Sequence, residues 1–224
     1  MTTNNRILTR ALAGVLVIGA SFMLSGCIIP TLIGGMMESY KESSTHTIPL
    51  DFDGLQGKSF AVMVAADRRI QSTDPSLVAK LTTAITARLI DNAGASGVVP
   101  PQSILELQYS TPGWAAMDYQ QICETLGCDM LIIVDLYEYR LNEPGNAYLW
   151  DGRATGQVGV IEAGSALGDD YIYSTTVSVG YPDGTGYGPT DMPLAAVSQR
   201  LQQRVIDRVS WLFFDHEEAY YMDY

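Results

Sequence analysis

The chain has 224 residues, of which 47% are hydrophobic and 17% charged, and its formal net charge is −12 at pH 7. This length and composition fit one domain of ordinary size with a substantial apolar core. Nucleic acid and anionic membrane surfaces both repel a polyanion, so the charge argues against either as a partner. The simplest interpretation of the acidic surface is solubility.

The first 26 residues have the features of a cleavable export signal. Arg6 and Arg10 supply a basic start, and residues 11–23 are uncharged and apolar. Leu24-Ser25-Gly26-Cys27 then resembles the lipobox of bacterial lipoproteins, a large apolar residue and two small residues before a cysteine. We therefore expect a signal peptide over 1–26 and cleavage before Cys27.

Cys27 is the predicted lipid attachment site. Its thiol would take a diacylglycerol and its freed amine a further acyl chain, and two chains suffice for stable anchoring. Ile28 stands where enterobacterial lipoproteins of the inner membrane tend to carry aspartate, so we predict an outer-membrane anchor with the domain facing the periplasm. An uncleaved membrane helix over the uncharged residues 11–37 is the alternative, but Pro30 and a glycine pair interrupt it.

The mature chain divides into three predicted parts. Residues 27–49 form the lipidated cysteine and a flexible tether, because they contain a glycine pair and a polar run. Residues 50–214 form an α/β domain. Residues 215–224 form an acidic, aromatic tail, which we expect to be frayed.

Buried strands and amphipathic helices alternate in the first half of the domain. Residues 130–134 are apolar on both faces, which is typical of a central strand covered on both sides. The expected elements are a strand over 59–65, a helix from 74 to 92, a short strand over 97–99, a helical turn over 103–107, a helix from 118 to 127 and a strand over 130–139.

The second half changes to a period of two. Residues 148–160 and 171–179 read as an antiparallel pair of half-buried strands, with Tyr148 on the same face as the apolar residues that follow. A final helix begins at Pro193, and Arg204 lies outside its apolar stripe. The order β-α-β-α-β-β-β-α predicts an α/β domain of two or three layers with a mixed sheet, parallel early and antiparallel late.

Three stretches of this pattern are similar to an envelope superfamily: 57–62, 98–100 and 126–134. The superfamily includes lipoprotein activators of penicillin-binding proteins, the curli secretion channel subunit and the N-terminal domain of the Tol propeller protein. The resemblance implies a fold similar to the anticodon-binding domain. Cys128 stands where the family usually has alanine, and the family has no common active site to carry over.

Cys123 and Cys128 are the two other cysteines of the chain. An exported protein can form a disulfide. However, Cys123 lies in a predicted helix. The Cα atoms of helical residues five positions apart are too distant for a disulfide, unless the chain turns back at Gly127. Two buried thiols are the favoured interpretation, and a disulfide is the alternative.

No set of residues typical of a catalytic site is recognisable in the sequence. The chain has only two histidines, His46 in the tether and His216 in the tail, and both are expected to be exposed. The adjacent pairs Asp169-Asp170 and Glu217-Glu218 are poor metal sites, because neighbours in a strand point to opposite faces. We expect no metal and no cofactor.

Two polar stretches are weaker candidates. Gly184-Thr185-Gly186-Tyr187-Gly188 resembles half of a nucleotide loop, but it is not predicted between a strand and a helix and no Lys-Ser/Thr follows it. Asp67-Arg68-Arg69 follows the first strand, where α/β sheets often bind ligands. A solvated loop is the favoured interpretation of both.

The sequence therefore predicts an anchored envelope lipoprotein that binds another envelope protein as an assembly or regulatory factor, and that is not an enzyme. One alternative is a subunit of an oligomeric envelope or secretion complex, including a homo-oligomer. The other is an enzyme acting on cell wall or carbohydrate with carboxylates such as Asp67 or Glu162.

Overall fold

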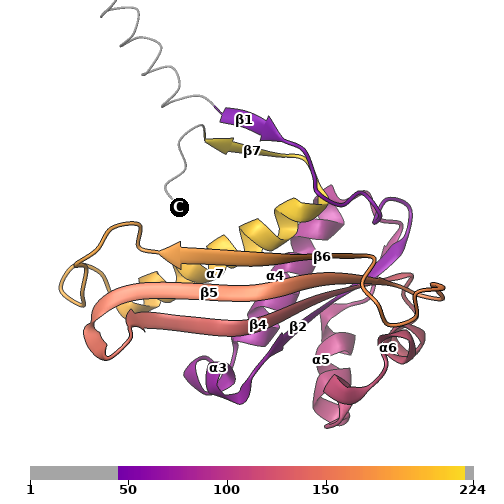
Figure 1. The fold of residues 1–224 in the computed structure, drawn as a ribbon, viewed down its shortest axis with the longest axis horizontal. Coiled ribbons are helices and arrows are strands. Elements are labelled where there is room, and N and C mark those ends of the chain that lie inside the picture. Colours follow the sequence, from indigo (N-terminus) through magenta and orange to yellow (C-terminus); the bar gives the residue numbers. More distant parts are fainter. Residues whose placement is uncertain (1–44, 220–224) are drawn as a thin grey trace, which may run out of the picture. The chain divides into compact units, whose positions relative to one another are not determined.

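A computed structural model describes residues 45–219 (Figure 1). They divide into a small two-stranded unit, in which β1 pairs with β7, and an α/β domain from Ile48 to His216. The elements are β1 Thr45–Ile48, β2 Ser59–Ala66, α3 Arg68–Thr73, α4 Leu77–Asn92, β3 Gly97–Val98, α5 Pro101–Ser110, η1 Trp114–Ala116, α6 Tyr119–Leu126, β4 Met130–Glu143, β5 Asn146–Glu162, β6 Tyr173–Tyr181, α7 Leu194–Ser210, η2 Trp211–Phe213 and β7 His216–Ala219.

The domain is built on a mixed five-stranded sheet in the order β3-β2-β4-β5-β6. β2 runs parallel to β3 and β4, whereas β4, β5 and β6 are successively antiparallel. This confirms the predicted α/β class, with parallel early strands and antiparallel late ones. It also confirms the central position of residues 130–134, which are all buried.

Helices cover the two faces of the sheet unequally. On one face, α4 and α7 pack over most of the sheet and enclose the larger core, which includes Phe60, Ile85 and the inward side chains of β4 and β5. On the other face, α5 and α6 enclose a smaller core around Met63, Leu131 and Ile133. The domain is therefore three layers deep near β2 and two layers deep near β6 (Figure 1).

The stretch 126–134 that carries the family resemblance has a clear structural role. Gly127 ends α6 with a φ of 67°, a left-handed conformation that glycine adopts without a side-chain clash. Asp129 then accepts hydrogen bonds from the hydroxyl and the backbone N–H of Ser59, at 2.7 and 2.8 Å, and these bonds lower the pKa of its carboxyl group. The motif joins the start of β4 to the start of β2.

Three segments differ from the sequence prediction. Residues 68–73 form the short helix α3 where a polar loop was expected, because Asp67 accepts a hydrogen bond from the N–H of Ile70 at 2.7 Å and Ile70 is buried. The helical turn at 103–107 is part of a longer helix, α5. Residues 45–48 and 216–219, expected in a tether and a frayed tail, form β1 and β7.

Candidate protein-binding site

One end of the domain is formed by a projecting hairpin. β2 pairs with β4 only as far as Leu136, but β4 continues to Glu143 and returns through Pro144 and Gly145 as β5. Gly145 has a φ of 81°, which lets the two strands connect through two residues. The hairpin therefore extends past β2, beside the loop 182–193 and the start of α7 (Figure 1).

The loop 182–193 is fastened to this hairpin. The backbone N–H of Trp150 donates to the carbonyl of Tyr187 at 2.8 Å, and the indole N–H of Trp150 donates to the carbonyl of Met192 at 2.9 Å. Gly188 approaches the hairpin so closely that a Cβ atom there would lie 2.7 Å from the carbonyl oxygen of Tyr148. These contacts give the end of the domain a defined surface.

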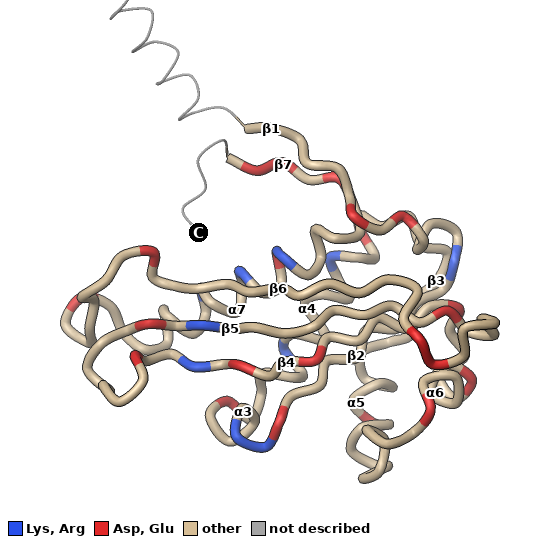
Figure 2. The backbone as a smooth tube through the Cα atoms, viewed as in Figure 1, with Lys and Arg blue, Asp and Glu red and all other residues tan. Residues whose placement is uncertain are grey.

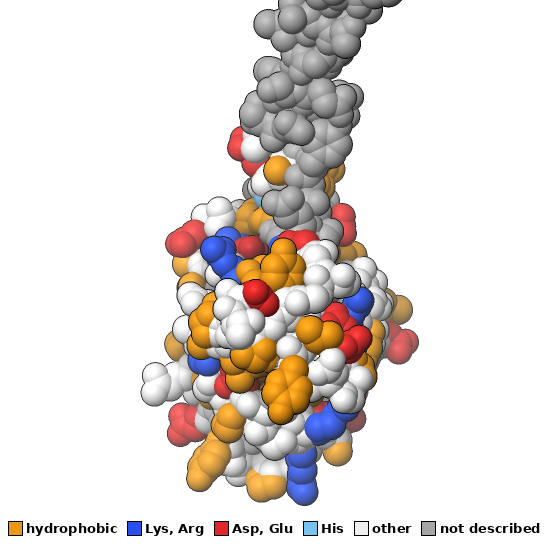
Figure 3. All heavy atoms as spheres, turned by 90° about the vertical axis from the view of Figure 1, so that its left-hand side faces the viewer, with side chains coloured by type: hydrophobic (Ala, Val, Ile, Leu, Met, Phe, Trp, Pro, Cys, Tyr) orange, Lys and Arg blue, Asp and Glu red, His pale blue; other side chains and the backbone are white. Residues whose placement is uncertain are grey.

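Three large side chains are exposed on this surface, which we call the aromatic end: Tyr148 is 79% exposed, Leu194 49% and Tyr187 40%. Hydrophobic side chains gather on this end of the molecule in Figure 3. Aromatic residues dominate the binding energy of many protein interfaces, whereas tyrosines used only for packing are mostly buried. The alternation of the sequence placed Tyr148 on the same face as the buried residues of β5, but the side chain of Tyr148 is itself exposed.

The aromatic end lies away from the point where the chain enters the domain. Asp51 and Phe52 both donate their backbone N–H groups to the carbonyl of Leu212, just beyond the C-terminal end of α7. The aromatic end lies at the opposite end of this 17-residue helix, a distance of about 25 Å. The first residues of the domain therefore leave this surface uncovered.

Arg204 holds the loop 182–193 against α7. Its guanidinium donates to the two carboxylate oxygens of Asp183 at 2.5 and 2.6 Å and to the carbonyl of Gly180, and it lies over the ring of Tyr181. Arg204 is only 8% exposed. The sequence predicted Arg204 outside the apolar stripe of the helix but did not indicate this burial, because its partners come from a loop about twenty residues earlier in the chain.

The face of the sheet that α5 and α6 leave uncovered is polar. Figure 2 shows acidic and basic residues side by side on β4 and β5. Arg140 pairs with Glu138 at 3.1 Å and with Asp151 at 2.8 Å. Burial opposes ionisation of Asp151, but the hydrogen bond and charge of Arg140 prevail and lower the pKa of this carboxyl group. The charges on this face largely neutralise one another.

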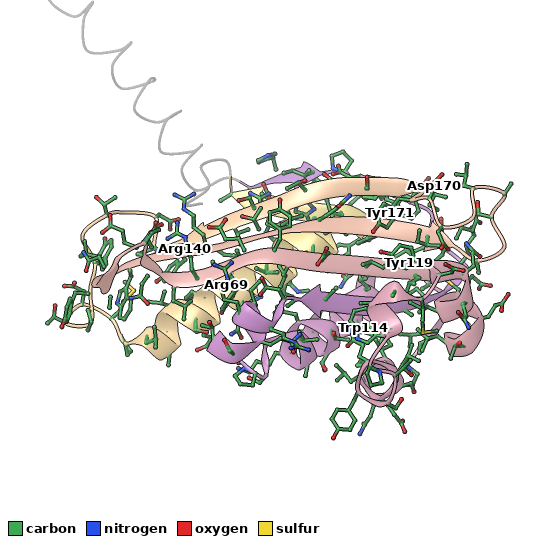
Figure 4. All side chains as sticks on the ribbon, turned by 60° about the horizontal axis from the view of Figure 1, so that its bottom comes forward. Arg69, Trp114, Tyr119, Arg140, Asp170 and Tyr171 are labelled. Carbon is green, nitrogen blue, oxygen red and sulfur yellow. The ribbon has the colours of Figure 1, made fainter. Side chains whose placement is uncertain are left out.

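Two tyrosines close the other end of this face. Figure 4 shows Tyr119 and Tyr171 together at one end and Arg69 and Arg140 at the other. The two hydroxyls lie 3.2 Å apart, and the ring of Tyr171 covers Gly159, where a Cβ atom would lie 2.4 Å from it. Burial raises the pKa of Tyr171, and the hydrogen bond with Tyr119 and the charge of Asp135 raise it further.

The raised pKa of Tyr171 gives a prediction for alkaline pH. Because the folded state keeps the phenol protonated, its contribution to stability is fully present below about pH 10, the ordinary pKa of tyrosine, and falls as the pH rises above that value. Tyr171→Phe removes this titration. We expect the difference in free energy of unfolding between wild type and Tyr171→Phe to shrink above pH 10 in urea titrations. If the free energy of unfolding falls equally with pH in both proteins, the prediction is contradicted. The control is Tyr109→Phe on α5.

The predicted lipid attachment site, Cys27, lies outside the described residues. Cys123 and Cys128 are both free and buried. The chain does turn back at Gly127, where the N–H of Cys128 donates to the carbonyl of Cys123 at 3.2 Å. The neighbouring Cys123 thiol and burial together raise the pKa of the Cys128 thiol.

The structure does not bring together the two carboxylates considered for catalysis. Asp67 follows the C-terminal end of β2, whereas Glu162 is paired with Met130, at the opposite end of the sheet. Eight residues of β2 separate these two ends, a span of roughly 25 Å. Paired carboxylates of glycosidases lie about 5 to 9.5 Å apart. Glu162 instead forms an ion pair with Lys58 at 2.6 Å.

The structure also places the glycine-rich stretch, the two histidines and Asp169. The stretch Gly184–Gly188 does lie between a strand and a helix, β6 and α7, contrary to the prediction, and it belongs to the aromatic end. His46 is exposed as expected, but His216 is half-buried and stacks on Trp211 with ring centroids 4.5 Å apart. Asp169 accepts a hydrogen bond from the N–H of Gln120 at 3.0 Å.

Residues 45–219 lack two kinds of feature. No group of three or more histidine, cysteine, aspartate or glutamate side chains in this part of the chain is placed to hold a metal ion. None of its helices combines the length and the apolar composition that crossing a bilayer requires.

The fold thus defines a single α/β domain with a mixed five-stranded sheet. No protein-family model matches the sequence, and no characterised protein matches it. Among solved structures, the chain is similar to lipoprotein GNA1162 from Neisseria meningitidis, with 12% identity, coverage of 68% of this chain and 97% of that one, and a TM-score of 0.43. It is also similar to PelC from Paraburkholderia phytofirmans, solved as a dodecamer, with 11% identity, coverage of 76% and 97%, and a TM-score of 0.40.

A third structure, the hypothetical protein CT253 from Chlamydia trachomatis, has 14% identity, coverage of 70% and 98%, and a TM-score of 0.42. TM-scores below 0.5 at this identity support no inference about the present chain. The likeness to the envelope superfamily and to the anticodon-binding fold therefore stays a prediction from the sequence.

Proposed function

We propose that the chain is an exported lipoprotein, anchored through Cys27, whose domain binds another envelope protein at its aromatic end. The anchor rests on the lipobox after a basic and apolar leader. The binding role rests on one observation, the gathering of exposed Tyr148, Tyr187 and Leu194 on a surface fixed by the Trp150 contacts. A rigid surface binds at a smaller entropic cost than a mobile loop.

The charges around the aromatic end indicate the chemistry of the partner. Glu143 and Asp191 are exposed in the hairpin and the loop that form this end. A partner surface with basic groups around an apolar or aromatic centre is therefore complementary to this end, and its association should weaken as ionic strength rises.

Alanine substitutions test this proposal. Tyr148→Ala combined with Tyr187→Ala removes two exposed rings without disturbing the core, so the fold should be retained. We expect the yield of the specific partner, recovered by crosslinking in intact envelopes, to fall by about tenfold or more, as for the loss of a binding hot spot. The control is Tyr109→Ala, which removes a tyrosine that is 91% exposed on α5. Equal yields from the two variants would count against the aromatic end.

A further inference from the structure

The two edges of the five-stranded sheet differ in length. β3 forms one edge with only two residues, Gly97 and Val98, whereas β6 forms the other with nine. Strand edges present unpaired N–H and C=O groups, and natural proteins protect them with short strands, charged side chains, prolines or bulges. The β3 edge is protected because this strand is so short.

The β6 edge lacks the other protections. Residues 173–181 include no charged residue and no proline, and their pairing with β5 runs without a bulge. Figure 2 shows β6 without acidic or basic residues along its whole length. The two ends of β6 have other contacts: Tyr173 packs against Phe52 and donates to Asp51, and Arg204 binds the carbonyl of Gly180. Within the part of the chain that the structure describes, no strand pairs with this edge.

A groove runs beside the same edge. Its volume is about 310 Å³, and residues 175–178 of β6 form one side of it. Ile48, Trp211 and Leu212 contribute apolar groups to the other side, and Asp51 and Arg208 contribute charged ones. An added strand at β6 would place the side chains of one of its faces in this groove.

The alternation of β6 specifies the strand that fits. Thr175, Val177 and Val179 point to the face that α7 covers, whereas Ser174, Thr176 and Ser178 are exposed on the open face. Directly opposite residues of antiparallel strands lie on the same face. A second β6 would thus set valine against valine and hydroxyl against hydroxyl. It would also join two copies along strands that carry no charged residue, although each chain has a net charge of −12.

We propose that the outer edge of β6 pairs antiparallel with β6 of a second copy of this chain. The pairing is related by a two-fold axis and extends the sheet from five strands to ten. It uses a different surface from the aromatic end, so the two proposals can fail independently.

Charge substitutions on the open face of β6 test the pairing. Thr176→Lys with Ser178→Lys, and Thr176→Glu with Ser178→Glu, each place like charges opposite one another in a pair of copies, while a single copy keeps them in solvent. We expect each variant to associate at least about tenfold more weakly than wild type. The full lipoprotein, extracted in mild detergent, is measured by light scattering on a sizing column. Wild type should run as two copies and each variant as one.

Mixing the two variants makes the test specific to β6. Lysine opposite glutamate is attractive, so the mixture should regain a two-copy species that contains both variants, identified by different affinity tags. Thr83→Lys with Ala87→Lys, on the exposed side of α4, is the control and should stay paired. Single copies for wild type, an unchanged mass for the lysine variant, or a mixture that stays single would each overturn the proposal.

Hydrogen exchange on the wild-type protein gives a check that needs no variant. Among residues 174–179, the amides that point away from β5 should exchange more slowly at high protein concentration than after dilution to single copies. Equal exchange at the two concentrations would also overturn the proposal.

Discussion

Replacing Cys27 with serine is expected to abolish lipid attachment completely and to leave the signal peptide uncleaved. Serine cannot form the thioether with diacylglycerol. Each lipid chain contributes about 0.8 kcal/mol for every buried methylene, so no contact of the acidic domain with the bilayer compensates for its loss. The prediction rests on the lipobox, which lies outside the described residues.

Membrane fractionation and mass spectrometry of the mature N-terminus measure this effect. The wild-type chain should begin at Cys27 and carry the mass of the lipid, and all of it should sediment with membranes. Cys123→Ala removes a thiol that is buried in the domain, so it should leave both results unchanged. If the serine variant keeps its membrane attachment and its processed size, the proposed anchor is wrong.

Replacing Arg204 with alanine is expected to lower the free energy of unfolding by about 1.5 to 3 kcal/mol, the usual cost of losing hydrogen bonds to charged groups. Arg204 is nearly buried and binds both Asp183 and the carbonyl of Gly180. Asp183 itself is partly exposed, so water stabilises its carboxylate after the change and keeps the loss below that of a fully buried pair.

Urea unfolding of both proteins measures this loss, and Arg200→Ala is the matched control. Arg200 lies one turn earlier on the same helix and is exposed, so its removal should change the free energy by less than about 0.5 kcal/mol. The Arg204 variant should also bind the partner more weakly, because the loop that carries Tyr187 loses its attachment to α7. Similar losses for the two arginines would contradict the role given to Arg204.

Local patterns in the sequence predicted most helices and strands well, because the formation of these elements depends on residues that are close together in the chain. The alternation over 148–160 and 171–179 indicated the antiparallel pair, and the glycine at 127 indicated the end of α6. The order β3-β2-β4 was not predictable, since it depends on contacts between strands that are distant in the chain. The helix α3 was missed because only six residues form it, and one capping aspartate with one buried isoleucine fixes it in place.

The candidate site was hardest to predict for the same reason. Tyr148 continues the apolar alternation of β5, which correctly indicates a strand but not whether another layer covers it. The hairpin extends past β2, so Tyr148 lies in solvent. Arg204 borders the apolar stripe of its helix, and its partner Asp183 comes from a loop whose position only the folded structure shows. The only feature of the sequence that pointed to this site was the glycine-rich stretch 184–188, which contains Tyr187.

A photoactivatable crosslinker placed at position 148 in intact envelopes tests the central proposal most directly. The exposed ring of Tyr148 lies within reach of any protein that covers the aromatic end. We expect one specific protein adduct from position 148 that is absent when the crosslinker is placed at position 109. No adduct at position 148, or the same adducts at both positions, would contradict a binding role for the aromatic end.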